Sequence, residues 1–207
     1  MLENSIRQFI DSAASKTPVP GGGSVSALAG ALGSSMGHMA CVFSTSDKYA
    51  DVKDKVEPAI SHFSEAAKKF SAYVEDDAKA YEGFNKAMKL PKSTPEEKTL
   101  RRTEMQNAIR GAIEVPRKVC VLAHESLEVI SGLSCYLNKN LISDVGVSGL
   151  MLRAAFEGAR LNVEINLAFL KDEKACEEIR HQVEGLAKEV EELASDLYDE
   201  VLEEIQG

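Results

Sequence analysis

Apolar side chains recur every three or four residues along most of this chain, which is the spacing of one face of an α-helix. The clearest stripe runs from Val56 to Met88, and a single position within it, Asp77, carries a charge. Its apolar members are Val56, Ile60, Phe63, Ala67, Phe70, Val74, Tyr81, Phe84 and Met88. If the stripe faces a core or a subunit interface, the Asp77 carboxylate is paired or faces a cavity, because an isolated buried charge is unstable. The alternative is that the stripe drifts around the helix and leaves Asp77 on a solvated rim beside Asp76.

The same periodicity predicts helices along the rest of the chain, and no segment alternates with period two for long enough to form a strand. The predicted helices cover residues 2–15, 24–46, 53–89, 95–115, 117–137, 145–170 and 179–205. Thr94 and Glu97 have the spacing of a capping box, and Pro116 predicts a kink or a break. We therefore expect an all-α fold with a single domain over residues 1–207, built as a bundle of long antiparallel helices.

The helix predicted at 24–46 is unusual because it consists mainly of small residues. No Asp, Glu, Lys or Arg occurs from Thr17 to Ser46, so a membrane span has to be considered. Glycines and serines interrupt the run, and large aliphatic residues are sparse, which argues against insertion. Gly33 and Gly37 lie four residues apart and would let another backbone approach closely. We expect this helix, capped by Ser24, to be buried on every side at the centre of the bundle.

The composition narrows the class of protein. With 24 Lys and Arg against 33 Asp and Glu, the net charge is -9, which disfavours binding to nucleic acid or to an anionic membrane. The four cysteines form no C-x-x-C pair, and we interpret them as reduced thiols. The charged, amphipathic N-terminus does not resemble a signal peptide. These features predict a cytoplasmic protein.

The turn TPVPGGGS, from Thr17 to Ser24, is a candidate binding element. Three consecutive glycines leave backbone N–H groups uncovered, and the following helix adds partial positive charge. An anionic or carbonyl-bearing ligand could bind there, although the turn lacks the lysine of a P-loop. The alternative is a hinge that lets the chain reverse tightly.

Amides form a further group of candidates. The segment NKNLISD occupies residues 138–144, and Asn162 and Asn166 share one helix face within a fairly apolar run. Buried amides need partners, which a polar heterocycle could supply; the alternative is an amide network that holds two helices in register. No grouping of His, Cys, Asp and Glu has the spacing of a metal site, so we expect no metal.

Four segments together resemble the cyclodeaminase family. They are TPVPGGGSVSALAGALG near the N-terminus, DAKAY at 77–81, QNAIRGAIEVP at 106–116, and NKNLISD leading into NVEIN at 162–166. The family includes the C-terminal domain of formiminotransferase-cyclodeaminase and stand-alone bacterial methenyltetrahydrofolate cyclohydrolases. The resemblance covers essentially the whole chain, and the PGGGS and NKNL-x-SD elements are specific when they occur together.

The resemblance implies an all-helical homodimer with active sites near the subunit interface, acting on folate-bound one-carbon groups. The first expectation is a formimidoyltetrahydrofolate cyclodeaminase, which releases ammonia and forms 5,10-methenyltetrahydrofolate. The alternative on the same scaffold is a cyclohydrolase that converts the methenyl bridge to 10-formyl-tetrahydrofolate. In both, the tetrahydrofolate derivative is the substrate and no cofactor is expected to remain bound.

Roles for individual residues are hypotheses that combine this resemblance with side-chain chemistry. Either Asp77 or Asp144 would exchange the proton, and the other carboxylate would hold the pterin edge. Lys139 is a candidate contact for the anionic glutamate tail. The other candidate substrate-binding residues are Pro20, Gly21, Gly22, Gly23, Ser24, Gln106, Asn140, Ser143, Asn162 and Asn166. A hypothesis of a different class is a non-catalytic acidic scaffold that binds partner helices through residues 179–205.

Overall fold

The structure is a computed structural model that describes residues 1–207, and it is entirely helical. Six α-helices follow one another: α1 (Ile6–Ala13), α2 (Gly22–Val42), α3 (Lys53–Met88), α4 (Pro95–Leu133), α5 (Ile142–Leu167) and α6 (Glu173–Gln206). Short 3-10 turns precede α3 and α5. The expectation of an all-α fold is confirmed. Thr94 and Glu97 form the predicted capping box at the start of α4.

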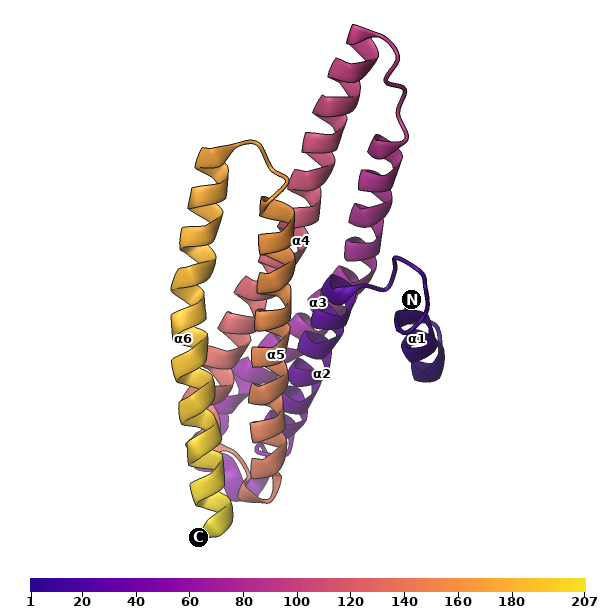
Figure 1. Cartoon of the computed structure of the whole chain (residues 1–207). Coiled ribbons are helices and arrows are strands. Elements are labelled where there is room, and N and C mark those ends of the chain that lie inside the picture. The colour runs from indigo at the N-terminus through magenta and orange to yellow at the C-terminus, as the bar shows by residue number, and fades with distance from the viewer.

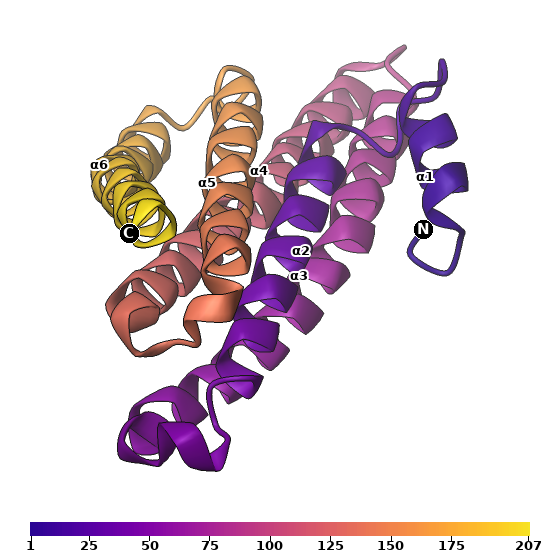
Figure 2. The same cartoon turned by 90° about the horizontal axis from the view of Figure 1, so that it is seen from below.

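The helices are arranged as two long hairpins, α3–α4 and α5–α6, and α2 packs between α3 and α5. The α3–α4 hairpin is the longer and projects beyond the α5–α6 hairpin (Figure 1). Helix α2 packs against α3 on one side and α5 on the other, while α1 stands apart beside α3 (Figure 2). The start of α2 lies near the end of α5, and both face the last third of α3.

Helix α2 has small residues at the positions where aromatic rings of α3 pack against it. A Cβ on Gly30 would lie 2.6 Å from the Phe70 ring, and one on Gly37 would lie 2.9 Å from the Phe63 ring. Both rings are fully buried in a core of 34 residues. The glycines thus permit a close approach of the two helices. The stripe of α3 faces the core from Val56 to Val74, whereas Tyr81 and Met88 at its end are exposed.

The expectation that α2 is buried on every side is wrong for the single chain. One face packs inside the bundle, but the opposite face leaves Val25, Leu32 and Phe43 exposed. By length and composition Gly22–Val42 could cross a membrane, but half of its most apolar window is buried inside the fold. Its contacts with α3 and α5 account for that apolar character, since core helices share the same composition.

The break expected at Pro116 is absent, because α4 continues through it. Proline has no N–H, so the carbonyl oxygen of Ala112 loses its usual partner one turn ahead. The side chain of Asn166 replaces that partner: its Nδ2 lies 3.1 Å from Ala112 O. A long-range contact from α5 thus satisfies the group that the proline leaves unpaired.

Candidate active site

One cavity gathers many of the predicted site residues. It has a volume of about 310 Å³ and lies between the start of α2, the last third of α3, the centre of α4 and the end of α5. Its walls are formed by Pro18, Val19, Gly21, Gly22, Gly23, Asp77, Ala80, Tyr81, Phe84, Ile109, Ala112, Asn162, Ile165, Asn166 and Phe169. The glycine turn, Asp77 and the two asparagines, selected separately from the sequence, therefore share one site.

Asp77 is held against the first turn of α2. Ser24 Oγ lies 2.8 Å from Asp77 Oδ2 and 3.1 Å from the carbonyl oxygen of Val74. A Cβ on Gly23 would lie 2.1 Å from Asp77 Oδ1, so only glycine leaves room for the carboxylate. From the sequence we expected Ser24 to cap α2, but this is wrong, because Gly21 is the N-cap. Ser24 is fully buried behind Asp77 and does not line the cavity.

This environment suits Asp77 to proton transfer. Burial raises the pKa of Asp77, and hydrogen bonding from Ser24 partly offsets that rise. The Ser24 hydroxyl fits both protonation states. It donates to the ionised carboxylate, or it accepts from the protonated carboxyl group while donating to Val74 O. Asp77 can therefore gain or lose a proton without leaving either group unpaired.

The two asparagines present acceptors to the cavity. Asn162 Nδ2 donates to Gly158 O at 2.8 Å, and Asn166 Nδ2 donates to Ala112 O and Asn162 O. Neither Oδ1 atom accepts a hydrogen bond from the protein, so both are free to accept one from a ligand. The amide network and the ligand site, proposed as alternatives from the sequence, coexist in these two residues. Together with Asp77 they favour a ligand rich in N–H donors or positive charge.

The apolar wall of the cavity was not recognised as part of a site from the sequence. Tyr81 and Phe84 belong to the stripe of α3 and were interpreted as core residues. They face Ile165 and Phe169 across the cavity, and Tyr81, Ile165 and Phe169 remain exposed in the single chain. Their position in the sequence could have indicated this role, because the stripe continues past Asp77 into the part of α3 that extends beyond the core. Such a wall suits a flat aromatic ligand.

Two other predicted residues lie beside the cavity and not in its wall. Pro20 is buried under the glycine turn, where it lines a neighbouring hollow with Phe9 and Glu75. Gln106 bridges two elements: its Nε2 donates to Phe169 O at 3.1 Å, and its Oε1 accepts from Lys171 N at 2.9 Å. It fixes the turn between α5 and α6 against α4, at the edge of the cavity.

The segment NKNLISD lies elsewhere in the same chain. Asp144 precedes Asn162 by 18 residues of α5, which corresponds to about 27 Å along the helix. Lys139 pairs with Glu204 in a separate hollow at the end of α6. The expectation that Lys139, Asn140, Ser143 and Asp144 join Asp77 is therefore not met within one protomer, because they occupy the opposite end of α5.

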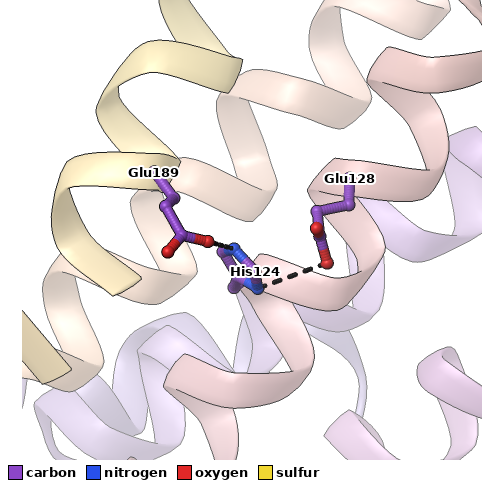
Figure 3. A group of neighbouring side chains, drawn as sticks. All are labelled: His124, Glu128 and Glu189. Atoms are coloured by element: carbon purple, nitrogen blue, oxygen red, sulfur yellow. Dashed lines mark hydrogen bonds and ion pairs between the residues drawn. The ribbon is translucent and has the colours of Figure 1, made fainter. Parts of the chain in front are cut away.

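A group of potential metal ligands lies outside the cavity, on α4 and α6. His124 is buried between two carboxylates: its Nε2 lies 2.7 Å from Glu189 and its Nδ1 lies 3.5 Å from Glu128 (Figure 3). The carboxylates approach different ring nitrogens, so a single ion on one nitrogen would not bind all three side chains in this arrangement. We interpret the group as a polar cluster in which the hydrogen bond between His124 and Glu189 links the two helices. The sequence pattern missed it because Glu189 is distant along the chain.

Comparison with known proteins assigns the chain to a class. The profile of the family described as formiminotransferase-cyclodeaminase matches residues 5–185. The methenyltetrahydrofolate cyclohydrolase of Methylorubrum extorquens is 32% identical over 198 residues, which cover 95% of each chain. The formimidoyltransferase-cyclodeaminase of Gallus gallus is 34% identical over 193 residues, which are 93% of this chain and 36% of that longer protein.

A solved structure of a similar protein has the same fold. The formiminotetrahydrofolate cyclodeaminase of Thermotoga maritima superimposes with a TM-score of 0.81 and 29% identity, covering 100% of this chain and 98% of that one. The fold is thus shared with an enzyme, which argues against the helical scaffold. The chain belongs to the formiminotransferase-cyclodeaminase family.

Proposed function

We propose that this protein is an enzyme acting on the one-carbon bridge between N5 and N10 of tetrahydrofolate, with 5-formimidoyltetrahydrofolate as the first candidate substrate. The observation that carries the proposal is the Asp77 carboxylate, which Ser24 holds inside a cavity with apolar walls. The name of the Thermotoga maritima neighbour supports the choice of substrate. The folate enters and leaves as a substrate, and no resident cofactor takes part in the proposal.

In the cyclodeaminase reaction, Asp77 moves one proton. N10 attacks the carbon of the protonated formimidoyl group, and a new bond forms between N10 and that carbon. The Asp77 carboxylate takes the proton from N10 and passes it to the departing nitrogen, which leaves as ammonia. One positive charge stays on the methenyl product. Asp77 and the Oδ1 atoms of Asn162 and Asn166 stabilise that charge.

The second candidate function is the cyclohydrolase reaction, favoured by the relative of the same length from Methylorubrum extorquens. Here a water oxygen bonds to the methenyl carbon, and Asp77 accepts the proton that the water loses. The bond between that carbon and N5 then breaks as N5 takes up a proton. The products are 10-formyl-tetrahydrofolate and one released proton. The same residues serve both reactions, because both pass through a tetrahedral carbon between N5 and N10.

An absorbance assay separates the two functions. The purified protein is incubated with 5-formimidoyltetrahydrofolate or with 5,10-methenyltetrahydrofolate, and the methenyl absorbance is followed. A rise on the first substrate, with stoichiometric ammonia, supports the cyclodeaminase. A fall on the second substrate above the uncatalysed rate supports the cyclohydrolase. No change on either substrate contradicts the proposed function.

The proposal includes a homodimer in which α2 and α5 face the partner. Apolar residues repeat along the outer face of α2 at intervals of three and four: Val25, Ala29, Leu32, Met36, Met39 and Phe43. The outer face of α5 exposes Val147, Leu150 and Leu161 beside them. Contiguous apolar surface of this kind is typical of an interface between subunits. A second copy on this face would bury the α2 helix on all sides, as the sequence led us to expect.

This arrangement would also complete the site. The cavity lies at one end of the α2–α5 face, and the segment from Asn138 to Asp144 lies at the other, where Asn138 N donates to Ser44. A twofold axis through the middle of the face carries the second end of one protomer onto the first end of its partner. Asn140, Ser143 and Asp144 would then serve the partner's cavity, with Asp144 on the pterin edge.

Charge introduced into the shared face tests the two-subunit site. Leu32→Glu changes a side chain that is 50% exposed, so the protomer should fold normally. We expect a monomer in sedimentation and turnover at least tenfold lower. Tyr198→Glu, at a 44% exposed position on α6, is the matched control and should leave both unchanged. An intact dimer, or a monomer with full activity, contradicts the proposed interface.

A further inference from the structure

Helix α4 carries a buried proline one turn beyond the wall of the cavity. Pro116 follows Ala112 by four residues, and Ala112 lines the cavity. In a regular helix the N–H of residue 116 would donate to the carbonyl oxygen of residue 112, but proline has no N–H. The cavity wall therefore contains a backbone oxygen whose regular donor is missing.

The side chain of Asn166 supplies a donor to this oxygen, and the contact fixes the direction of its amide. Its Nδ2 lies 3.1 Å from Ala112 O and 2.8 Å from Asn162 O. Both neighbours are carbonyl oxygens, which only accept, so only the NH2 end of the amide fits between them. The reversed amide would place Oδ1 against two oxygens and lose both hydrogen bonds. Asn166 is thereby fixed as a hydrogen-bond acceptor at the cavity.

The amide of Asn162, which lines the same cavity, is held differently. Its Nδ2 donates to Gly158 O at 2.8 Å, one turn back in its own helix, and makes no other hydrogen bond to the protein. One N–H of Asn162 is therefore free for a ligand, and this side chain can both donate and accept. Asn166 has both N–H groups engaged and offers the ligand only its oxygen. The difference between the two residues arises from the proline of the neighbouring helix.

We propose that Pro116 is a positioning residue, which fixes the Asn166 amide so that the cavity selects a group that donates N–H over one that presents an oxygen. Pro116 does not line the cavity and acts only through Asn166. The inference rests on the proposed function, in which the formimidoyl nitrogen is such a donor. A formyl group of the same shape would place its oxygen against Asn166 Oδ1 and leave two acceptors unpaired.

Two folates of the same shape and opposite polarity measure this selection. The KM for 5-formimidoyltetrahydrofolate is compared with the inhibition constant of 5-formyltetrahydrofolate. If the first ligand is not turned over, calorimetric titration of both gives the same ratio of affinities. We expect the wild type to favour the formimidoyl ligand at least tenfold.

Pro116→Ala should lower this ratio about fivefold. The backbone N–H that returns at residue 116 competes for Ala112 O, so the Asn166 amide loses one of its two fixing contacts. One hydrogen bond contributes about 1 kcal/mol net, which is a factor of about five. We expect KM to carry the change and kcat to stay within about twofold, because the contact with the cationic group exists in the substrate and in the transition state alike.

A double-mutant cycle separates this role from a general effect of the proline on α4. In an Asn166→Ala background, Pro116→Ala should change the ratio less than twofold, because the amide through which it acts is gone. Pro58→Ala is the matched control: it replaces an exposed proline near the start of α3 and should leave the ratio unchanged.

The outcomes distinguish this inference from the proposed function. An unchanged ratio in Pro116→Ala, or an equal fall with and without Asn166, overturns the positioning role. A wild type that binds the formimidoyl and formyl ligands equally also overturns it. Absence of turnover, with the expected ratios measured by titration, contradicts only the proposed reaction.

Discussion

Gly23→Ala is the substitution that most sharply tests how the site is built. The new Cβ would lie 2.1 Å from Oδ1, 2.6 Å from Cγ and 2.9 Å from Oδ2 of Asp77. Because carbon and oxygen atoms pack at about 3.5 Å, the carboxylate has to move by at least about 1 Å. That movement breaks its 2.8 Å contact with Ser24. A misplacement of this size lowers turnover by about 100-fold, which equals about 2.7 kcal/mol of transition-state stabilisation.

Stability should respond far less than activity to this change. Alanine is favoured over glycine inside a helix by up to about 1 kcal/mol, which offsets part of the strain from the displaced carboxylate. We expect kcat to fall about 100-fold while the melting temperature stays within a few degrees of the wild type. Gly185→Ala is the control, since nothing lies within 4 Å of its Cβ, and it should keep full activity. Wild-type kcat in a folded Gly23→Ala protein would refute the proposed packing of Asp77 on this turn.

Three further changes follow from the same contacts. Ser24→Ala removes a hydrogen bond that lowers the pKa of Asp77, so the acidic limb of the kcat–pH profile should move to higher pH. If the acidic limb stays at the wild-type pH, the protonation of Asp77 does not control the rate. Asp77→Asn should melt at a higher temperature than the wild type at pH 7. A carboxyl group whose folded pKa is raised destabilises the fold as pH rises above its ordinary value of 3.8, so the difference should vanish below that pH. Equal melting temperatures at pH 7 would contradict this. Asn166→Ala leaves Ala112 O without a donor and should lower the free energy of unfolding by about 1–3 kcal/mol. In a Pro116→Ala background, where the backbone N–H returns, the loss should be smaller; an equal loss in both backgrounds would disprove the pairing.

The sequence predicted the parts of the fold and site that depend on local periodicity. The position of Asp77 within the α3 stripe indicated a carboxylate at the edge of the core, and the glycine turn and the asparagine pair were found by their composition. Helix α4 was predicted to kink or break at Pro116, because the compensating hydrogen bond from Asn166 comes from a distant part of the chain. Such tertiary contacts leave no trace in local spacing.

The segment NKNLISD could not be placed relative to Asp77 from the sequence, for a different reason. NKNLISD was grouped with Asp77 because both belong to the resemblance to the family, but motif order along a chain gives no distances in space. Asp144 and Asn162 lie near opposite ends of α5, so the length of that helix keeps them apart.

The central claim is that Asp77 exchanges the proton in a reaction at the N5–N10 bridge. Its most direct test is the initial rate of change of methenyl absorbance, measured for the wild type and for Asp77→Asn with whichever folate the wild type converts. We expect the variant to fold and to bind the folate, with kcat lower by about 10² to 10⁴-fold. A folded Asp77→Asn protein that turns over at the wild-type rate would contradict the claim.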